Sequence, residues 1–113
     1  MSKAQVINEF GSPEVMQWRD WHVPDPSPGE VRLRHTAIGV NFADTYHRGG
    51  ISHPWKVDNP PVVIGFEGVG MVEGVGEGVT NFQTGDKVAY GIPPLGSYAE
   101  TRNYPADKLL HMP

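Results

Sequence analysis

The glycine-rich stretch GFEGVGMVEGVGEGV, residues 65–79, is the first part of the sequence whose spacing could bind a nucleotide. Dinucleotide phosphates are held by the pattern G-x-G-x-x-G between a strand and a helix, because the helix N-terminus carries partial positive charge. Reading from Gly68 gives G-V-G-M-V-E and reading from Gly74 gives G-V-G-E-G-V, so the third glycine is missing in both. The P-loop ending G-K-[ST] is absent, and the following residues show no helical period. The stretch is therefore not interpreted as a phosphate loop.

The same glycines indicate a strand with one bare face. They lie at the even positions 68, 70, 74, 76 and 78, whereas Val69, Met71 and Val75 lie at odd positions. Successive side chains of a strand point to opposite faces. A face without side chains favours a tight bend or the close approach of another backbone. A plain turn at positions 76 and 78 is the alternative, and the sequence leaves both open.

Metal chemistry has little support in the residues. The chain has no cysteine, which excludes disulfides and thiolate metal sites. Its histidines show no ligand spacing; they are His22, His35, His47, His53 and His111. We therefore expect no metal site.

Size and charge narrow the class of protein further. With 113 residues the chain has the length of one domain. Nine Lys and Arg against thirteen Asp and Glu give a net charge of −4, which argues against a nucleic-acid partner. The N-terminus lacks the apolar core of a signal peptide and no apolar run approaches membrane-spanning length. We expect a cytoplasmic protein without a membrane partner.

The elements that must position any site are short strands and turns. Eleven prolines and fourteen glycines make long helices unfavourable. Alternating or β-branched runs predict a mainly β fold, an irregular or partly closed barrel with one or two short helices. The strands are expected within residues 4–10, 14–23, 30–40, 62–75, 86–90 and 97–104.

One short helix is expected within residues 41–50, NFADTYHRGG. Asn41 is a suitable N-cap, and Asp44 lies three residues later near the positive end of the helix. The double glycine at Gly49 and Gly50 ends the helix.

Three motifs in fixed order resemble a known family. They are GVNFADTYHRGG at 39–50, IGFEGVGMVEGVGEGV at 64–79 and GDKVAYG at 85–91, followed by GSYAE at 96–100. The ordered set resembles the N-terminal catalytic, GroES-like domain of the medium-chain dehydrogenase/reductase superfamily, and most closely its zinc-free quinone oxidoreductases. The resemblance covers residues 1–113 and implies a mainly β, GroES-like, partly open β-barrel with one or two short helices.

Departures from the zinc alcohol dehydrogenases separate the branches. That branch has zinc-binding cysteine and histidine where this chain has Asn41 and Phe66. Phenylalanine has no donor atom and an amide oxygen is a poor zinc ligand. The lobe of four cysteines that holds a structural zinc is also missing, so the resemblance implies a zinc-free protein.

The resemblance also implies roles for single residues. Asn41 and Tyr46 would be catalytic hydrogen-bond donors beside the nicotinamide of NADPH and the quinone. The cofactor contact would comprise Asn41, Phe42, Ala43, Asp44, Thr45 and Tyr46. Arg48 would fix the helix through a carboxylate or line the cleft, and Glu67 would be structural, as would the Asp44 carboxylate. The alternatives are that Asn41 is only an N-cap and Tyr46 an ordinary core aromatic.

Members of that superfamily continue into a Rossmann nucleotide-binding domain, which would hold most of the NADPH and which these 113 residues do not contain. The chain is therefore expected to be part of a longer, homodimeric NADPH:quinone oxidoreductase and to be inactive alone. Two alternatives remain: a zinc-free reductase of enones or enoyl thioesters, and a free-standing GroES-like binding or assembly module.

Overall fold

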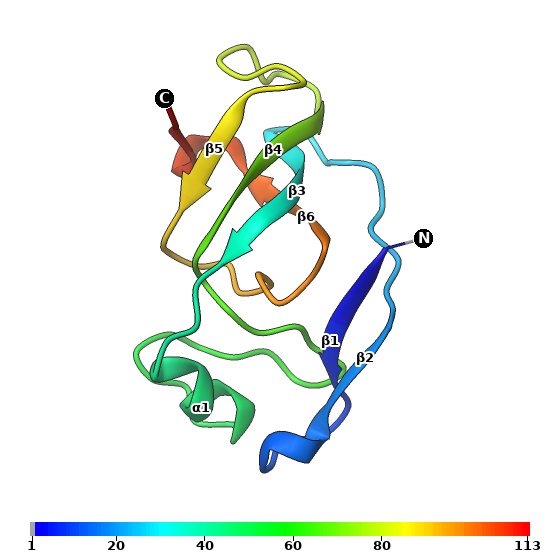
Figure 1. Cartoon of the computed structure of the whole chain (residues 1–113), viewed down its shortest axis with the longest axis vertical. Coiled ribbons are helices and arrows are strands. Elements are labelled where there is room, and N and C mark those ends of the chain that lie inside the picture. The colour runs from blue at the N-terminus through cyan, green and yellow to red at the C-terminus, as the bar shows by residue number, and fades with distance from the viewer. Residues whose placement is uncertain (1) are drawn as a thin grey trace.

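The chain folds into two open antiparallel sheets with one short helix (Figure 1). The computed structural model describes residues 2–113. The small sheet pairs β1 (Lys3–Ile7) with β2 (Met16–Asp20). The large sheet has the order β6-β3-β4-β5-β7, formed by β3 (Glu30–Ile38), β4 (Gly68–Val75), β5 (Lys87–Tyr90), β6 (Thr101–Pro105) and β7 (Leu110–His111). The prediction of a mainly β fold is confirmed, and the sheets do not close into a barrel.

Helical structure is limited to short pieces. The helix α1 spans Ala43–Arg48, and single 3-10 turns span Pro13–Val15 and Ala106–Lys108. In Figure 1 α1 lies at the lower left, below the large sheet, and the hairpin of β1 and β2 lies at the lower right. No helix within residues 2–113 has the length and apolarity needed to cross a membrane.

Three buried clusters hold these pieces together. The largest lies on one face of the large sheet and includes Val31 and Leu33 of β3, which the alternation of that strand predicted. The two smaller clusters join the hairpin to residues 57–64 and 98–99. Single bridges from Ala4 to Ala99 and from Ile7 to Val62 make the same connection through the backbone.

Several expected strands have different limits in the structure. The strand expected over residues 4–10 ends at Ile7, and the one expected over residues 30–40 ends at Ile38. Residues 62–67 do not belong to the glycine strand: Val62 forms only one bridge, Gly65 turns the chain with φ at +99°, and β4 begins at Gly68. The strand expected from residue 14 begins at Met16, after the 3-10 turn that Pro13 opens. The strand expected from residue 97 begins at Thr101.

The bare face of β4 accepts close neighbours. A Cβ on Gly70 would overlap the carbonyl oxygen of Arg34 on β3, and a Cβ on Gly68 would overlap the side chains of His35 and Tyr90. Just beyond β4, a Cβ on Gly76 would overlap a backbone carbonyl of residue 27. The prediction of close backbone approach is thus confirmed at positions 70 and 76. Position 78, with φ at +84°, is a turn glycine.

Alanine at Gly70 is expected to lower the free energy of unfolding by about 1–3 kcal/mol, because the added methyl must displace backbone atoms. Gly74→Ala is the matched control on the same strand, since a Cβ added at that position would meet no atom within 4 Å. That control is expected to change stability by less than about 1 kcal/mol. Urea denaturation of both variants is the measurement, and equal stability of the two would contradict the close packing at Gly70.

Candidate active site

The segment that leads into α1 is fixed by hydrogen bonds from its own first turn. The N–H groups of Asp44 and Thr45 donate to the carbonyls of Asn41 and Phe42, each at 3.0 Å. The Asp44 carboxylate reaches back and accepts from the N–H of Asn41 at 3.0 Å. The prediction that Asn41 caps the helix is wrong, because its side chain turns away and donates Nδ2 to Oε1 of Glu67 at 3.1 Å.

Asp44 is buried, and its carboxylate joins α1 to a distant part of the chain. Its Oδ2 accepts the hydroxyl of Tyr98 at 2.5 Å, a contact that spans 54 positions in sequence. Burial raises the pKa of Tyr98, and the hydrogen bond to Asp44 raises it further. The hydroxyl therefore remains a donor at any physiological pH. The structural role expected for Asp44 follows from these contacts.

The remaining predicted site residues lie on the outer side of this segment. Phe42 is 75% exposed and Tyr46 is 36% exposed. Their rings meet edge to face at 5.5 Å, and Tyr46 makes a similar contact with His53 at 5.9 Å. Thr45 is exposed and donates its hydroxyl to Phe42, and Ala43 is half-buried. The alternative that Tyr46 is a core aromatic is wrong at this exposure.

Arg48 ends α1 and ties it to the turn that follows β1. Its Nε donates to the carbonyl of Gly11 at 3.1 Å, and the N–H of Gly11 donates back to the Arg48 carbonyl at 3.0 Å. The prediction of a carboxylate partner for Arg48 is therefore wrong. The residue stabilises the C-terminal end of the helix through these two hydrogen bonds to Gly11.

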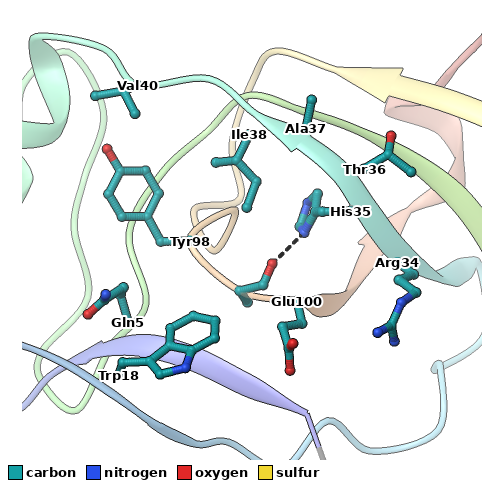
Figure 2. A pocket seen from close by; sticks show the side chains of 11 residues that line it. Gln5, Trp18, Arg34, His35, Thr36, Ala37, Ile38, Val40, Tyr98 and Glu100 are labelled. Atoms are coloured by element: carbon teal, nitrogen blue, oxygen red, sulfur yellow. Dashed lines mark hydrogen bonds between the residues drawn. The ribbon is translucent and has the colours of Figure 1, made fainter.

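A cavity of about 420 Å³ lies between the end of β3 and the hairpin of β1 and β2. Figure 2 shows Ile38 and Val40 above it, Trp18 and Glu100 below it and Arg34 toward the right. None of residues 41–46 lines the cavity. It is nevertheless adjacent to them, because Val40 precedes Asn41 and Tyr98, another lining residue, bonds Asp44.

His35 of β3 lies in the wall of this cavity (Figure 2). It is half-buried and belongs to a chain of hydrogen-bonded polar groups. Its Nδ1 lies 2.7 Å from the carbonyl of Ala99 and its Nε2 lies 2.6 Å from the hydroxyl of Tyr90. A carbonyl only accepts, so Nδ1 carries the proton and Nε2 accepts from Tyr90. The Tyr90 oxygen accepts in turn from Arg102 at 3.4 Å.

The comparisons with known proteins agree with this architecture. Residues 27–113 match the alcohol dehydrogenase GroES-like domain. The chain belongs to this family. Its relatives include a 2-haloacrylate reductase from a Burkholderia species, 53% identical over the whole chain and 34% of that protein. A quinone oxidoreductase from Pseudomonas aeruginosa is 44% identical over the whole chain, which again covers 34% of that protein.

A solved structure gives the same family likeness. The Escherichia coli quinone oxidoreductase, crystallised with NADPH, superimposes with a TM-score of 0.90 at 36% identity. The match covers 98% of this chain and 33% of that chain. The chain thus spans about a third of the length of the relatives it matches. The resemblance to GroES-like domains of quinone oxidoreductases is confirmed.

Sequence reasoning missed several residues of this GroES-like domain. Tyr98 gave no signal, because its contact with Asp44 depends on the folding of two distant segments. His35 had one usable signal: it continues the odd-numbered series of Val31 and Leu33, which places it on the inward face of β3. Glu67 was recognised as structural, but its bond to Asn41 was not anticipated.

His35 predicts a measurable dependence of stability on pH. Burial lowers its pKa from about 6.5 to about 4, the carbonyl of Ala99 opposes this effect, and the charge of Arg102 adds to it. Between these two values the unfolded chain binds the proton more tightly, so stability is full above pH 6.5 and falls as pH drops toward 4.

Chemical denaturation at several pH values tests this expectation. The free energy of unfolding of the wild type should fall between pH 6.5 and 4, and His35→Gln should show a shallower slope because glutamine does not titrate. Part of the slope should persist in the variant, since burial also lowers the pKa of His47 on α1. An unchanged slope in His35→Gln would show that His35 titrates normally in the folded protein.

Proposed function

We propose that this GroES-like domain is the N-terminal catalytic part of a zinc-free, NADPH-dependent reductase whose substrate is a quinone. The observation that carries the proposal is the segment from Asn41 to Tyr46. Its backbone is held by a buried carboxylate, while the side chains of Phe42 and Tyr46 remain exposed. The names of the relatives, which are reductases and oxidoreductases, support the same interpretation.

Zinc does not fit the residues at the two positions where the metal-dependent branch binds it. The Asn41 amide already donates to Glu67, and the Phe66 ring packs edge to face on Trp55 at 4.6 Å. Neither position offers a thiolate or an imidazole. A Lewis acid helps hydride addition to a plain aldehyde by stabilising the alkoxide. A quinone spreads the developing charge over a ring and two oxygens, so placed hydrogen-bond donors are sufficient.

The residues of this segment fit the nicotinamide end of NADPH, which supplies the hydride when bound. The aromatic rings of Phe42 and Tyr46 offer flat apolar surface. We assign the Tyr46 hydroxyl as the donor to a substrate oxygen. No phosphate-binding glycine pattern occurs in the 113 residues. We therefore assign the phosphates and adenosine to a Rossmann domain in the remaining length of the protein, which we expect to be a cytoplasmic homodimer.

A second candidate substrate is an electron-poor alkene. The 53% identical relative is named a 2-haloacrylate reductase, which is a higher identity than that of the quinone oxidoreductase. Hydride addition to such an alkene has the same requirements, because the developing charge is delocalised onto a neighbouring carboxyl or carbonyl. The binding-module alternative has no comparable support, since it gives no reason for an exposed tyrosine beside a segment whose backbone is hydrogen-bonded to a buried carboxylate.

Steady-state kinetics of the full-length enzyme test the proposal with a panel of quinones, enones and 2-haloacrylates. The enzyme should reduce quinones with NADPH, and a zinc chelator should leave the rate unchanged. Tyr46→Phe should lower kcat/KM roughly ten- to a hundred-fold. This is at the low end of the rate loss that follows removal of one preorganised donor, because a quinone needs less stabilisation than a plain carbonyl. The thermal stability of this variant should stay near that of wild type, because the ring and its contacts remain.

Tyr104→Phe is the matched control. Its hydroxyl is buried and donates to the carbonyl of Ile92 at 2.8 Å, away from α1. This variant should lose stability and keep its activity. A full-length protein without hydride transfer to any member of the panel would contradict the proposed function. Full quinone activity in Tyr46→Phe would remove Tyr46 from the site.

A further inference from the structure

Asn41 is held from two sides by two different carboxylates. Asp44 accepts its backbone N–H at 3.0 Å, and Glu67 accepts its side-chain amide at 3.1 Å. The first contact fixes the position of the Cα. The second fixes the rotation of the amide, which is the group that a ligand would meet.

The backbone of Glu67 is held in place by a hydrogen bond of its own. Its carbonyl accepts the N–H of Gly39 at 3.0 Å, so the two chain segments run side by side. Gly39 has no side chain, and a Cβ there would overlap the Glu67 carboxyl group. The carboxylate therefore occupies the space that any other residue at position 39 would fill. The glycine at this position has a packing reason, which is to let Glu67 reach Asn41.

The contact decides which end of the Asn41 amide faces outward. A carboxylate only accepts, so the amide nitrogen must point to Glu67 and the oxygen must point away. Among residues 2–113 of the described structure, Oδ1 of Asn41 has no hydrogen-bond partner. Asn41 therefore presents an acceptor to any ligand. This differs from the role of donor that the family resemblance implied.

We propose that Glu67 is a positioning residue that orients Asn41 so that its Oδ1 accepts a hydrogen bond from the nicotinamide end of the cofactor. The proposal rests on the proposed function. A quinone has only acceptor oxygens, so the Asn41 oxygen suits an N–H or O–H of the cofactor and not the substrate. The carboxamide N–H and a ribose hydroxyl are the two groups with this chemistry. Tyr46 is then the donor to the substrate, while Asn41 is the acceptor for the cofactor.

Kinetics of four full-length variants test this division: Glu67→Ala, Glu67→Gln, Asn41→Ala and the double variant Asn41→Ala/Glu67→Ala. Glu67→Ala should raise the KM for NADPH about tenfold, because the binding energy of about one hydrogen bond is lost. The same variant should change kcat much less. Glu67→Gln should restore a KM near that of wild type, because its side-chain oxygen still accepts from Asn41. The double variant should be no worse than Asn41→Ala, since Glu67 acts through Asn41. Additive effects in the double variant, or a failure of Gln to rescue, would overturn the proposal.

An NADPH analogue identifies the cofactor group. The 3-acetylpyridine analogue lacks the carboxamide N–H and keeps the ribose hydroxyls. If the carboxamide is the donor, Asn41→Ala should weaken NADPH binding and leave binding of the analogue unchanged. If a ribose hydroxyl is the donor, both should weaken equally. Unchanged binding of both cofactors would contradict the proposal.

NMR on the 113-residue chain tests the positioning contact independently of activity. The side-chain amide proton of Asn41 that is bonded to Glu67 should resonate downfield of its position in an unstructured chain. Glu67→Ala should shift this resonance upfield toward the unstructured value, and Glu67→Gln should do so only in part. A resonance that does not respond to Glu67→Ala would refute the contact even in an active enzyme. A responsive resonance in a protein that reduces nothing would instead refute the proposed function.

Discussion

The candidate site depends on one buried carboxylate. Asp44 is 4% exposed, and its Oδ2 accepts both the Tyr98 hydroxyl and the Asn41 N–H. A buried charge is costly unless hydrogen bonds stabilise it, so these two donors must be in place for the fold to form here. A helix of six residues is also too short to be stable by itself. The tertiary contact through Asp44 is therefore what fixes α1 and the residues that precede it.

The two sheets are arranged so that this contact can form. Tyr98 lies next to Ala99, which bridges Ala4 of the hairpin. The same stretch supplies the carbonyl that binds His35 and the N–H of residue 100 that donates to β1. The hairpin, β3 and the segment before β6 thus meet beside α1. The cavity near Val40 lies at this junction, which places a pocket open to solvent next to the proposed hydride-transfer site.

Local patterns in the sequence predicted the parts of the fold that depend on local chemistry. The alternation of β3, the bare face of β4 and the double glycine after α1 all follow from side-chain period or backbone freedom. The patterns failed where a contact with a residue distant in sequence determines the local structure. A capping preference placed the Asn41 side chain on its own helix, whereas Glu67, 26 positions away, binds it instead. The β-branched residues at 62–63 resembled a strand but pack into two clusters under the hairpin.

Amide hydrogen exchange on the 113-residue chain tests the role of Asp44 most directly. The Asn41 N–H should exchange slowly, because it is bonded to a buried carboxylate, while the N–H of Phe42, which has no acceptor among the described residues, should exchange rapidly. Tyr98→Phe removes the other donor to Asp44 and should reduce the protection of Asn41 at least tenfold, about 1.4 kcal/mol in opening free energy. If Asn41 and Phe42 exchange at similar rates in the wild type, or if Tyr98→Phe leaves Asn41 fully protected, Asp44 does not organise this site.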